Sequence, residues 1–180
     1  IFRPTLLAVF NITNTQLGAF FSMYGIVAMA SYFFGGPLAD RFATRSLMAV
    51  ALWLTGLSGI LFATIPSNTI VYALYAFWGS TTILLFWAAL IRATREWGGT
   101  QYQGRAFGYL EAGRGLTAAL LGSITVVIFS YFTPHDAVNS MALDRTTAFQ
   151  YVILVASAIT CISGALVWFF VPVNNDSLKH

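Results

Sequence analysis

Glu111 and Arg114 stand three residues apart in an otherwise apolar run of the sequence. Counted from Arg105 at about 1.5 Å per helical residue, they lie about 9 and 13 Å inside the span that we expect there. Residues three apart share a helix face, so we expect these two to pair. Ionisable residues at such depth mark either a functional site or a mutually satisfied structural pair, and the sequence leaves both open. In a functional site, Arg114 offers a planar fork for a carboxylate or phosphate, and Glu111 offers a site for a proton.

A second group of charges breaks an apolar run at the stretch GGPLADRFATR. Its charged members are Asp40, Arg41 and Arg45. The Gly-Gly-Pro sequence before them predicts a tight turn over residues 37–45, because glycine lets the backbone close and proline stiffens the exit. Asp40 is placed to accept hydrogen bonds from the N-terminus of the next helix or from a nearby arginine. An ordinary charged loop explains the same residues on composition alone.

The elements that position these residues are transmembrane helices. Hydrophobic residues make up 58% of the 180-residue chain and charged residues 8%, and the mean hydropathy is +0.74. Too few polar side chains remain to coat a soluble globule, so we expect an integral membrane protein. Apolar runs long enough to cross a hydrocarbon layer of about 30 Å predict an all-α, polytopic bundle of about five spans. Their ranges are 14–36, 46–64, 69–91, 105–132 and 148–171.

The connections predict the orientation of the chain. Residues 1–13 are expected to form the end of a preceding helix and an external loop, and residues 173–180 a cytoplasmic tail. Basic residues gather on one side, which the positive-inside rule makes cytoplasmic. That side holds Arg41, Arg45, Arg92, Arg95, Arg105 and Lys179, against Arg3 and Arg145 on the other. The turn 37–45 is therefore expected in the cytoplasm, and the protein in a bacterial inner membrane.

Small residues recur along the span 105–132 at alternating steps of four and three. They are Gly108, Ala112, Gly115, Ala119 and Gly122. Such a stripe lets helix backbones approach closely in lipid, where packing rather than the hydrophobic effect holds helices together. We expect it to serve helix packing.

Residues 36–45 resemble the signature loop of the major facilitator superfamily, Gly-x-Leu-Ala-Asp-Arg-x-Gly-Arg-Arg/Lys, which joins the second and third helices of that family. The matching residues are Gly36, Leu38, Ala39, Asp40, Arg41 and Arg45. Ala43 stands where the family has Gly, and Thr44 where it usually has Arg. The resemblance implies helices two to six of a twelve-helix transporter, in its N-terminal half. The second half is the alternative, because the loop recurs there in weaker form.

That resemblance implies secondary active transport of a small solute by alternating access against a second half that is absent here. It implies that Gly36, Asp40, Arg41 and Arg45 form a cytoplasmic latch that holds one conformation. It also implies that the span 69–91 lines the central cavity. Together with Glu111 and Arg114, it favours an organic anion as substrate, moved with a proton or another ion. The partners expected are the substrate, the lipid bilayer and the second half.

Other classes of protein remain in view. A membrane scaffold or receptor that transports nothing fits the hydropathy equally well. An intramembrane enzyme would need a nucleophile with a base, a metal triad or a phosphate cradle inside a span. The spans hold no histidine, and Cys161 has no base near it in sequence. We therefore expect no enzyme, no cofactor and no metal site. Dispersed arginines also argue against nucleic acid as a partner.

Overall fold

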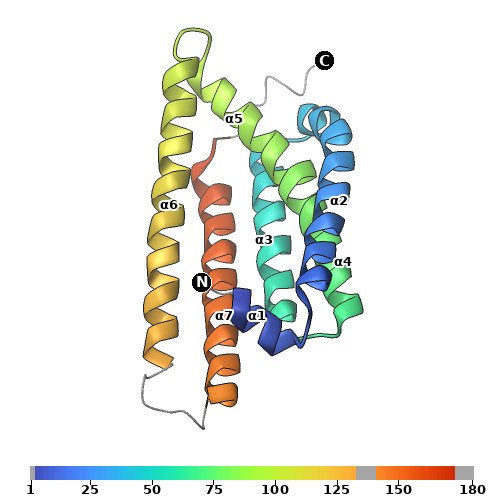
Figure 1. Cartoon of the computed structure of the whole chain (residues 1–180). Coiled ribbons are helices and arrows are strands. Elements are labelled where there is room, and N and C mark those ends of the chain that lie inside the picture. Colours follow the sequence, from blue (N-terminus) through green and yellow to red (C-terminus); the bar gives the residue numbers. More distant parts are fainter. Residues whose placement is uncertain (1–2, 133–140, 173–180) are drawn as a thin grey trace.

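The chain folds into a bundle of long helices. The computed structural model describes the backbone of residues 3–132 and 141–172, and the side chains of 3–127 and 146–172. Within these ranges every regular element is a helix. Five helical stretches are long and apolar enough to cross a membrane, and Figure 1 shows them running side by side along one axis. The all-α transmembrane bundle expected from the sequence is confirmed.

The helices extend further than the apolar runs alone indicated. Their bounds are α1 (Arg3–Phe10), α2 (Asn14–Arg41), α3 (Thr44–Ala63), α4 (Asn68–Ser80), η1 (Thr81–Trp87), α5 (Ala88–Gly98), α6 (Gln103–Phe132) and α7 (Met141–Phe170). The stretch α4, η1 and α5 is one continuous helix with a π-helical middle. In the predicted external loop 1–13, most residues belong to α1, so only 11–13 connect it to α2. The predicted tail, 173–180, lies outside the described residues.

The tight turn predicted over residues 37–45 is present, but its predicted bounds are too wide. Helix α2 runs through Pro37 and ends at Arg41, so that only two residues, Phe42 and Ala43, separate it from α3. A proline inside a helix costs one backbone hydrogen bond, and transmembrane helices tolerate this because neighbouring groups satisfy the freed carbonyl. The charged stretch is therefore mostly the last turn of a helix.

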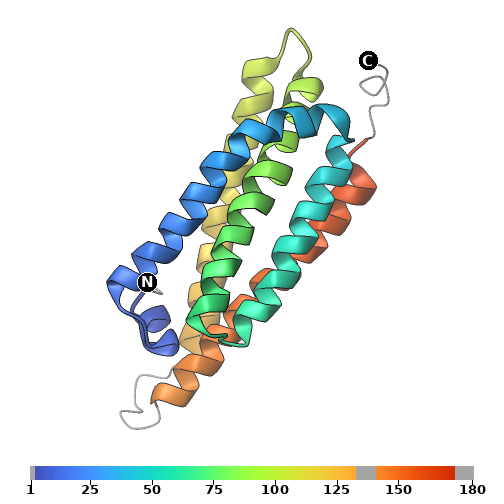
Figure 2. The ribbon, with the colours of Figure 1, turned by 90° about the vertical axis from the view of Figure 1, so that its right-hand side faces the viewer.

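Two helix pairs form the body of the bundle. Helix α3 packs most extensively against α7, and α2 packs against α4; Figure 2 shows both pairs side by side. Glycines bring the backbones together at these contacts: Gly56, Gly59 and Gly164 between α3 and α7, and Gly79 between α4 and α2. A Cβ atom on Gly79 would lie 2.6 Å from the carbonyl oxygen of Tyr24. Close backbone approach is how helices gain packing energy in lipid.

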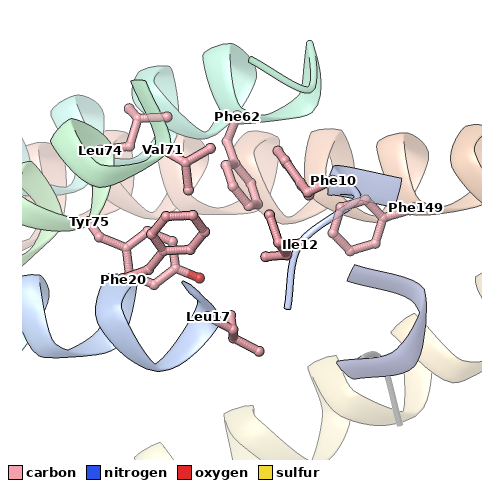
Figure 3. Packing of buried hydrophobic residues seen from close by; sticks show 9 residues of the cluster. All are labelled: Phe10, Ile12, Leu17, Phe20, Phe62, Val71, Leu74, Tyr75 and Phe149. Carbon is pink, nitrogen blue, oxygen red and sulfur yellow. The ribbon is translucent and has the colours of Figure 1, made fainter. Parts of the chain in front are cut away.

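A cluster of buried aromatic and aliphatic side chains fills one end of the bundle. The connections that carry the basic residues lie at the opposite end. Figure 3 shows its buried members, Phe10, Ile12, Leu17, Phe20, Phe62, Val71, Leu74, Tyr75 and Phe149. The Phe10 ring stacks on Phe62 with centroids 5.0 Å apart, and Phe62 meets Phe149 at 6.4 Å. Offset and edge contacts of this kind add to the packing energy of the buried area. The cluster ties α1, α2, α3, α4 and α7 together at one end.

Helix α6 stands apart from this core. None of its described residues joins a buried cluster, and no residue from 107 to 127 is buried. The stripe Gly108, Ala112, Gly115, Ala119 and Gly122 is exposed, and a Cβ atom on any of its glycines would meet nothing within 4 Å. The expected packing role of the stripe is therefore not realised among the described residues. Periodicity identified a face of α6, but it did not identify the helix on which that face packs.

Replacing Gly79 by Ala tests the close contact between α4 and α2. The added methyl group would overlap backbone atoms, which cannot rotate away, so we expect a loss of about 1–3 kcal/mol of stability. Thermal unfolding of the detergent-purified protein measures it. Gly25→Ala is the matched control on the facing helix, since nothing lies within 4 Å of its Cβ position. Equal melting temperatures for the two variants would contradict the contact.

Candidate functional site

A wide cavity of about 1130 Å³ lies between α2, the helix formed by η1 and α5, and α6. Its polar and aromatic lining comes from all three: Tyr24 and Tyr32 on α2, Thr82 and Trp87 on η1, and Tyr109, Glu111, Arg114 and Thr117 on α6. We call it the Arg114 cavity. One of these helices contains the predicted span 69–91, for which the family resemblance implied a cavity wall. Glu111 and Arg114 thus lie where a solute can reach them.

Glu111 and Arg114 form the pair that their spacing predicted. The Arg114 Nη1 atom donates to Glu111 Oε1 at 2.6 Å. Their side chains remain 50% and 61% exposed, Arg114 and Glu111 respectively, so the pair faces open space instead of packed protein. The guanidinium of Arg114 also lies over the ring of Trp87, with its Cζ atom 4.9 Å from the ring centroid. The ring face of Trp87 and the carboxylate of Glu111 together fix the plane of the Arg114 guanidinium.

Hydroxyl groups line the opposite wall. The Tyr24 hydroxyl lies 3.0 Å from Thr82 Oγ1, joining α2 to η1. Thr82 also donates to the carbonyl oxygen of Trp78, one turn back, at 2.5 Å. Thr82 thus lines the cavity and also bonds its own backbone. Thr82 belongs to the π-helical stretch η1, and such stretches often accompany functional sites.

A separate charge network joins the basic ends of α2 and α5. Arg92 Nη1 lies 3.8 Å from Asp40 Oδ1, and Arg92 Nε donates to Glu96 Oε1 at 2.8 Å. The Arg92 guanidinium also donates to the carbonyl oxygen of Ala39, near the end of α2. Arg92 is 17% exposed and Asp40 79% exposed, so the arginine is the anchored partner and the carboxylate the accessible one. Asp40 does have an arginine partner, as expected. Its other expected role is not seen, because no side chain caps the start of α3.

Arg41 and Arg45 have different surroundings. Arg41 is the exposed last residue of α2. Arg45 lies in the first turn of α3, where its Cζ atom sits 4.9 Å from the ring centroid of Trp168 on α7. Trp53 in turn meets Trp168 at 5.9 Å. Arg45 is thus engaged in holding α3 to α7.

Gly36 and its neighbour Gly35 also have different surroundings. A Cβ atom on Gly35 would lie 3.1 Å from the Cβ atom of Ala88, so Gly35 permits close approach of α2 to α5. Nothing lies within 4 Å of the Cβ position of Gly36. Of these two glycines, only Gly35 lies at a close helix contact.

Three residues of these sites were not singled out from the sequence: Trp87, Arg92 and Glu96. The four-residue spacing of Arg92 and Glu96 was a signal for a helical ion pair. The predicted span 69–91 stops before both residues, whereas α5 continues to Gly98. No sequence signal pairs Trp87 with Arg114, because they lie on different helices. Among the described residues, no group of three or more His, Cys, Asp or Glu side chains could hold a metal ion.

Comparisons with known proteins agree with this architecture. The family model described as Major Facilitator Superfamily matches residues 1–180. Inner membrane protein YqcE of Escherichia coli K12 is 32% identical over 176 residues, which are 98% of this chain and 39% of that protein. Inner membrane protein YihN of the same organism is 29% identical over 123 residues, 68% of this chain and 29% of that protein.

A more distant relative comes from another organism. The uncharacterized protein MG294 homolog of Mycoplasma pneumoniae is 24% identical over 179 residues, 94% of this chain and 38% of that protein. No solved structure matches at a significant level. The chain thus spans about two fifths of the length of the relatives that match most of it.

The fold, the apolar helices and the relatives lead to one assignment. Five helices are suited to crossing a membrane, and two of the relatives are named as inner membrane proteins. An integral protein of a bacterial inner membrane follows. The family model covers the whole chain and agrees with the signature residues at the end of α2. The chain belongs to the Major Facilitator Superfamily of membrane transporters.

Proposed function

We propose that this chain is the N-terminal half of a secondary active transporter that moves a small organic anion, together with a proton, by alternating access. The observation that carries the proposal is the half-exposed Arg114 in a cavity between three helices. A guanidinium inside a membrane domain is costly, and such residues usually face a substrate pathway. A scaffold or receptor, the competing class, has no need of a charge there.

The anion preference rests on the form of the arginine. Its guanidinium carries five N–H donors, and the single hydrogen bond described for it goes to Glu111. Trp87 covers one face of the guanidinium and leaves the edge of the fork for a ligand. A carboxylate or phosphate matches that edge with two parallel hydrogen bonds. An anion would therefore take the place of the Glu111 carboxylate.

Proton coupling follows from this exchange. When an anion occupies Arg114, the Glu111 carboxylate loses its partner 2.6 Å away. A carboxylate without a partner inside a membrane domain is unfavourable, and uptake of a proton neutralises it. Anion binding and protonation of Glu111 then favour each other, which couples the two movements. Carboxylates serve as proton relays in many transporters.

The network around Arg92 is the proposed latch. Asp40 is the exposed member of this network, and its carboxylate is accessible to a second half of the transporter. Charge pairs that form in one conformation and break in the other supply the differential energy that a rocking motion needs. This chain spans about two fifths of the length of its relatives. The proposal therefore also includes a second half, a pathway between the two halves and the absence of enzymatic activity.

Arg114→Ala should abolish uptake by the complete protein while leaving its insertion into the membrane intact, because the anion loses the cationic partner that the described cavity lining offers it. Uptake into cells or proteoliposomes measures it. Arg105→Ala is the matched control: this arginine lies at the start of the same helix, over Tyr102 at 5.5 Å and outside the cavity. Wild-type uptake by Arg114→Ala would contradict the proposed role of Arg114 in substrate binding.

Glu111→Gln should uncouple proton movement from anion movement. The amide cannot take up a proton, so anion-driven proton movement should be lost while exchange of internal for external anion continues. A pH-sensitive dye trapped in proteoliposomes reports the first process, and isotope exchange reports the second. Glu111→Asp, which keeps the acid, should retain both. Full proton movement in Glu111→Gln would refute the assignment of the proton site.

Asp40→Asn should shift the balance between inward-open and outward-open states, because the neutral amide weakens the bond to Arg92. Labelling of introduced cysteines from each side of the membrane measures the shift. Arg92→Gln should shift it in the same direction, and the double variant should shift it no further than the larger single change. Arg95→Gln removes an exposed arginine one turn from Arg92 and should leave labelling unchanged. The same result with Asp40→Asn would count against the latch.

A further inference from the structure

The two walls of the Arg114 cavity differ in what they offer a ligand. The α6 wall carries the charged pair, and the wall formed by α2 and η1 carries hydroxyl groups. We infer that the substrate is a monocarboxylate with a hydroxylated carbon chain, held by its carboxylate at Arg114 and by a hydroxyl group at Tyr24. This inference rests on the proposed function, because it names the class of anion that the same site takes.

The direction of the hydrogen bonds on the hydroxyl wall determines what Tyr24 can recognise. The single hydroxyl proton of Thr82 is donated to the carbonyl oxygen of Trp78 at 2.5 Å. In the 3.0 Å contact between the two hydroxyls, Tyr24 must then be the donor and Thr82 the acceptor. The Tyr24 oxygen keeps its acceptor capacity on the cavity wall. It therefore matches a ligand O–H group, which an unsubstituted acyl chain lacks.

The charges in the cavity set the charge of the ligand. Among the described residues that line it, Arg114 and Glu111 are the only formally charged ones, and they sum to zero. A monoanion on Arg114, with one proton on Glu111, keeps that sum at zero. A dianion would leave one negative charge without a cationic partner among the described lining residues, which is costly inside a membrane domain. A neutral polyol offers nothing that would displace the Glu111 carboxylate.

The size and the remaining walls of the cavity fit such a ligand. A volume of about 1130 Å³ holds a small metabolite with room for bridging water. Ile83, Phe86 and Leu90 supply apolar surface beside the polar groups. Sites that hydrogen-bond a substrate hydroxyl reject analogues without it, because their own polar group is then left unpaired. Tyr24 is therefore the proposed specificity-determining residue, and Arg114 the anchor.

Competition for binding to the complete protein in proteoliposomes tests the inference. The probe is radiolabelled D-gluconate, a hydroxylated monocarboxylate. The competitors are hexanoate without hydroxyl groups, the dianion glucarate, the neutral polyol sorbitol and inorganic phosphate. We expect gluconate to bind at least about tenfold more tightly than hexanoate and glucarate, the difference that one well-made hydrogen bond or one uncompensated charge provides. Sorbitol should not compete. This comparison needs no substitution, so it stands even if a variant fails to fold.

Tyr24→Phe then locates the hydroxyl contact. It should reduce the preference for gluconate over hexanoate by about tenfold while leaving the affinity for hexanoate unchanged. Tyr72→Phe is the matched control, since this tyrosine packs on Phe20 with ring centroids 4.5 Å apart and does not line the cavity.

The outcomes separate the two proposals. If hexanoate, glucarate or phosphate binds as tightly as gluconate and Arg114→Ala removes that binding, the substrate class is overturned and anion transport stands. Unchanged preference in Tyr24→Phe overturns the role of Tyr24. If no anion binds in an Arg114-dependent way, the proposed function falls and this inference falls with it.

Discussion

The structure depends on one constraint, which is that hydrocarbon cannot form hydrogen bonds. Every backbone N–H and C=O group in the spans must find its partner within the protein, and a helix provides this locally. The described residues accordingly form helices and short connections only. The one irregular stretch inside a span, the π-helical η1, has hydroxyls of Thr81 and Thr82 directed at the carbonyl oxygen of Trp78. Irregular backbone is tolerated where side chains complete its hydrogen bonds.

The same constraint decides where charge is found. Arg114 has both a carboxylate and a ring face, and Arg92 has two carboxylates and a backbone carbonyl. Each arginine is thus compensated before any ligand or partner arrives. The first set of contacts joins α6 to η1 at the cavity wall, and the second joins the ends of α2 and α5. A charge that exchanges partners at low cost is a suitable element for a switch between two conformations.

Packing among the helices follows from a second aspect of lipid. Helices in a bilayer gain little from hydrophobic burial against each other, so their contacts depend on close approach and shape. Glycines at the contacts of α3 with α7 and of α4 with α2 provide that approach. Among the described residues of α6, such a contact occurs only at its start, where a Cβ atom on Gly98 would lie 2.8 Å from that of Ala106, and residues 107–127 are not buried. The Arg114 cavity lies along this less buried part of α6.

Composition and apolar run length determined that the chain is an all-α membrane protein, and spacing along one helix determined that Glu111 and Arg114 pair. Both are local properties, set by transfer free energy and by the helical repeat. The tertiary structure decided everything that joins separate helices. It placed Trp87 under Arg114, gave Arg92 to Asp40 and gave Trp168 to Arg45. It also left the small-residue stripe of α6 uncovered. A periodic pattern defines a face of a helix, but which helix meets that face depends on how all the others pack.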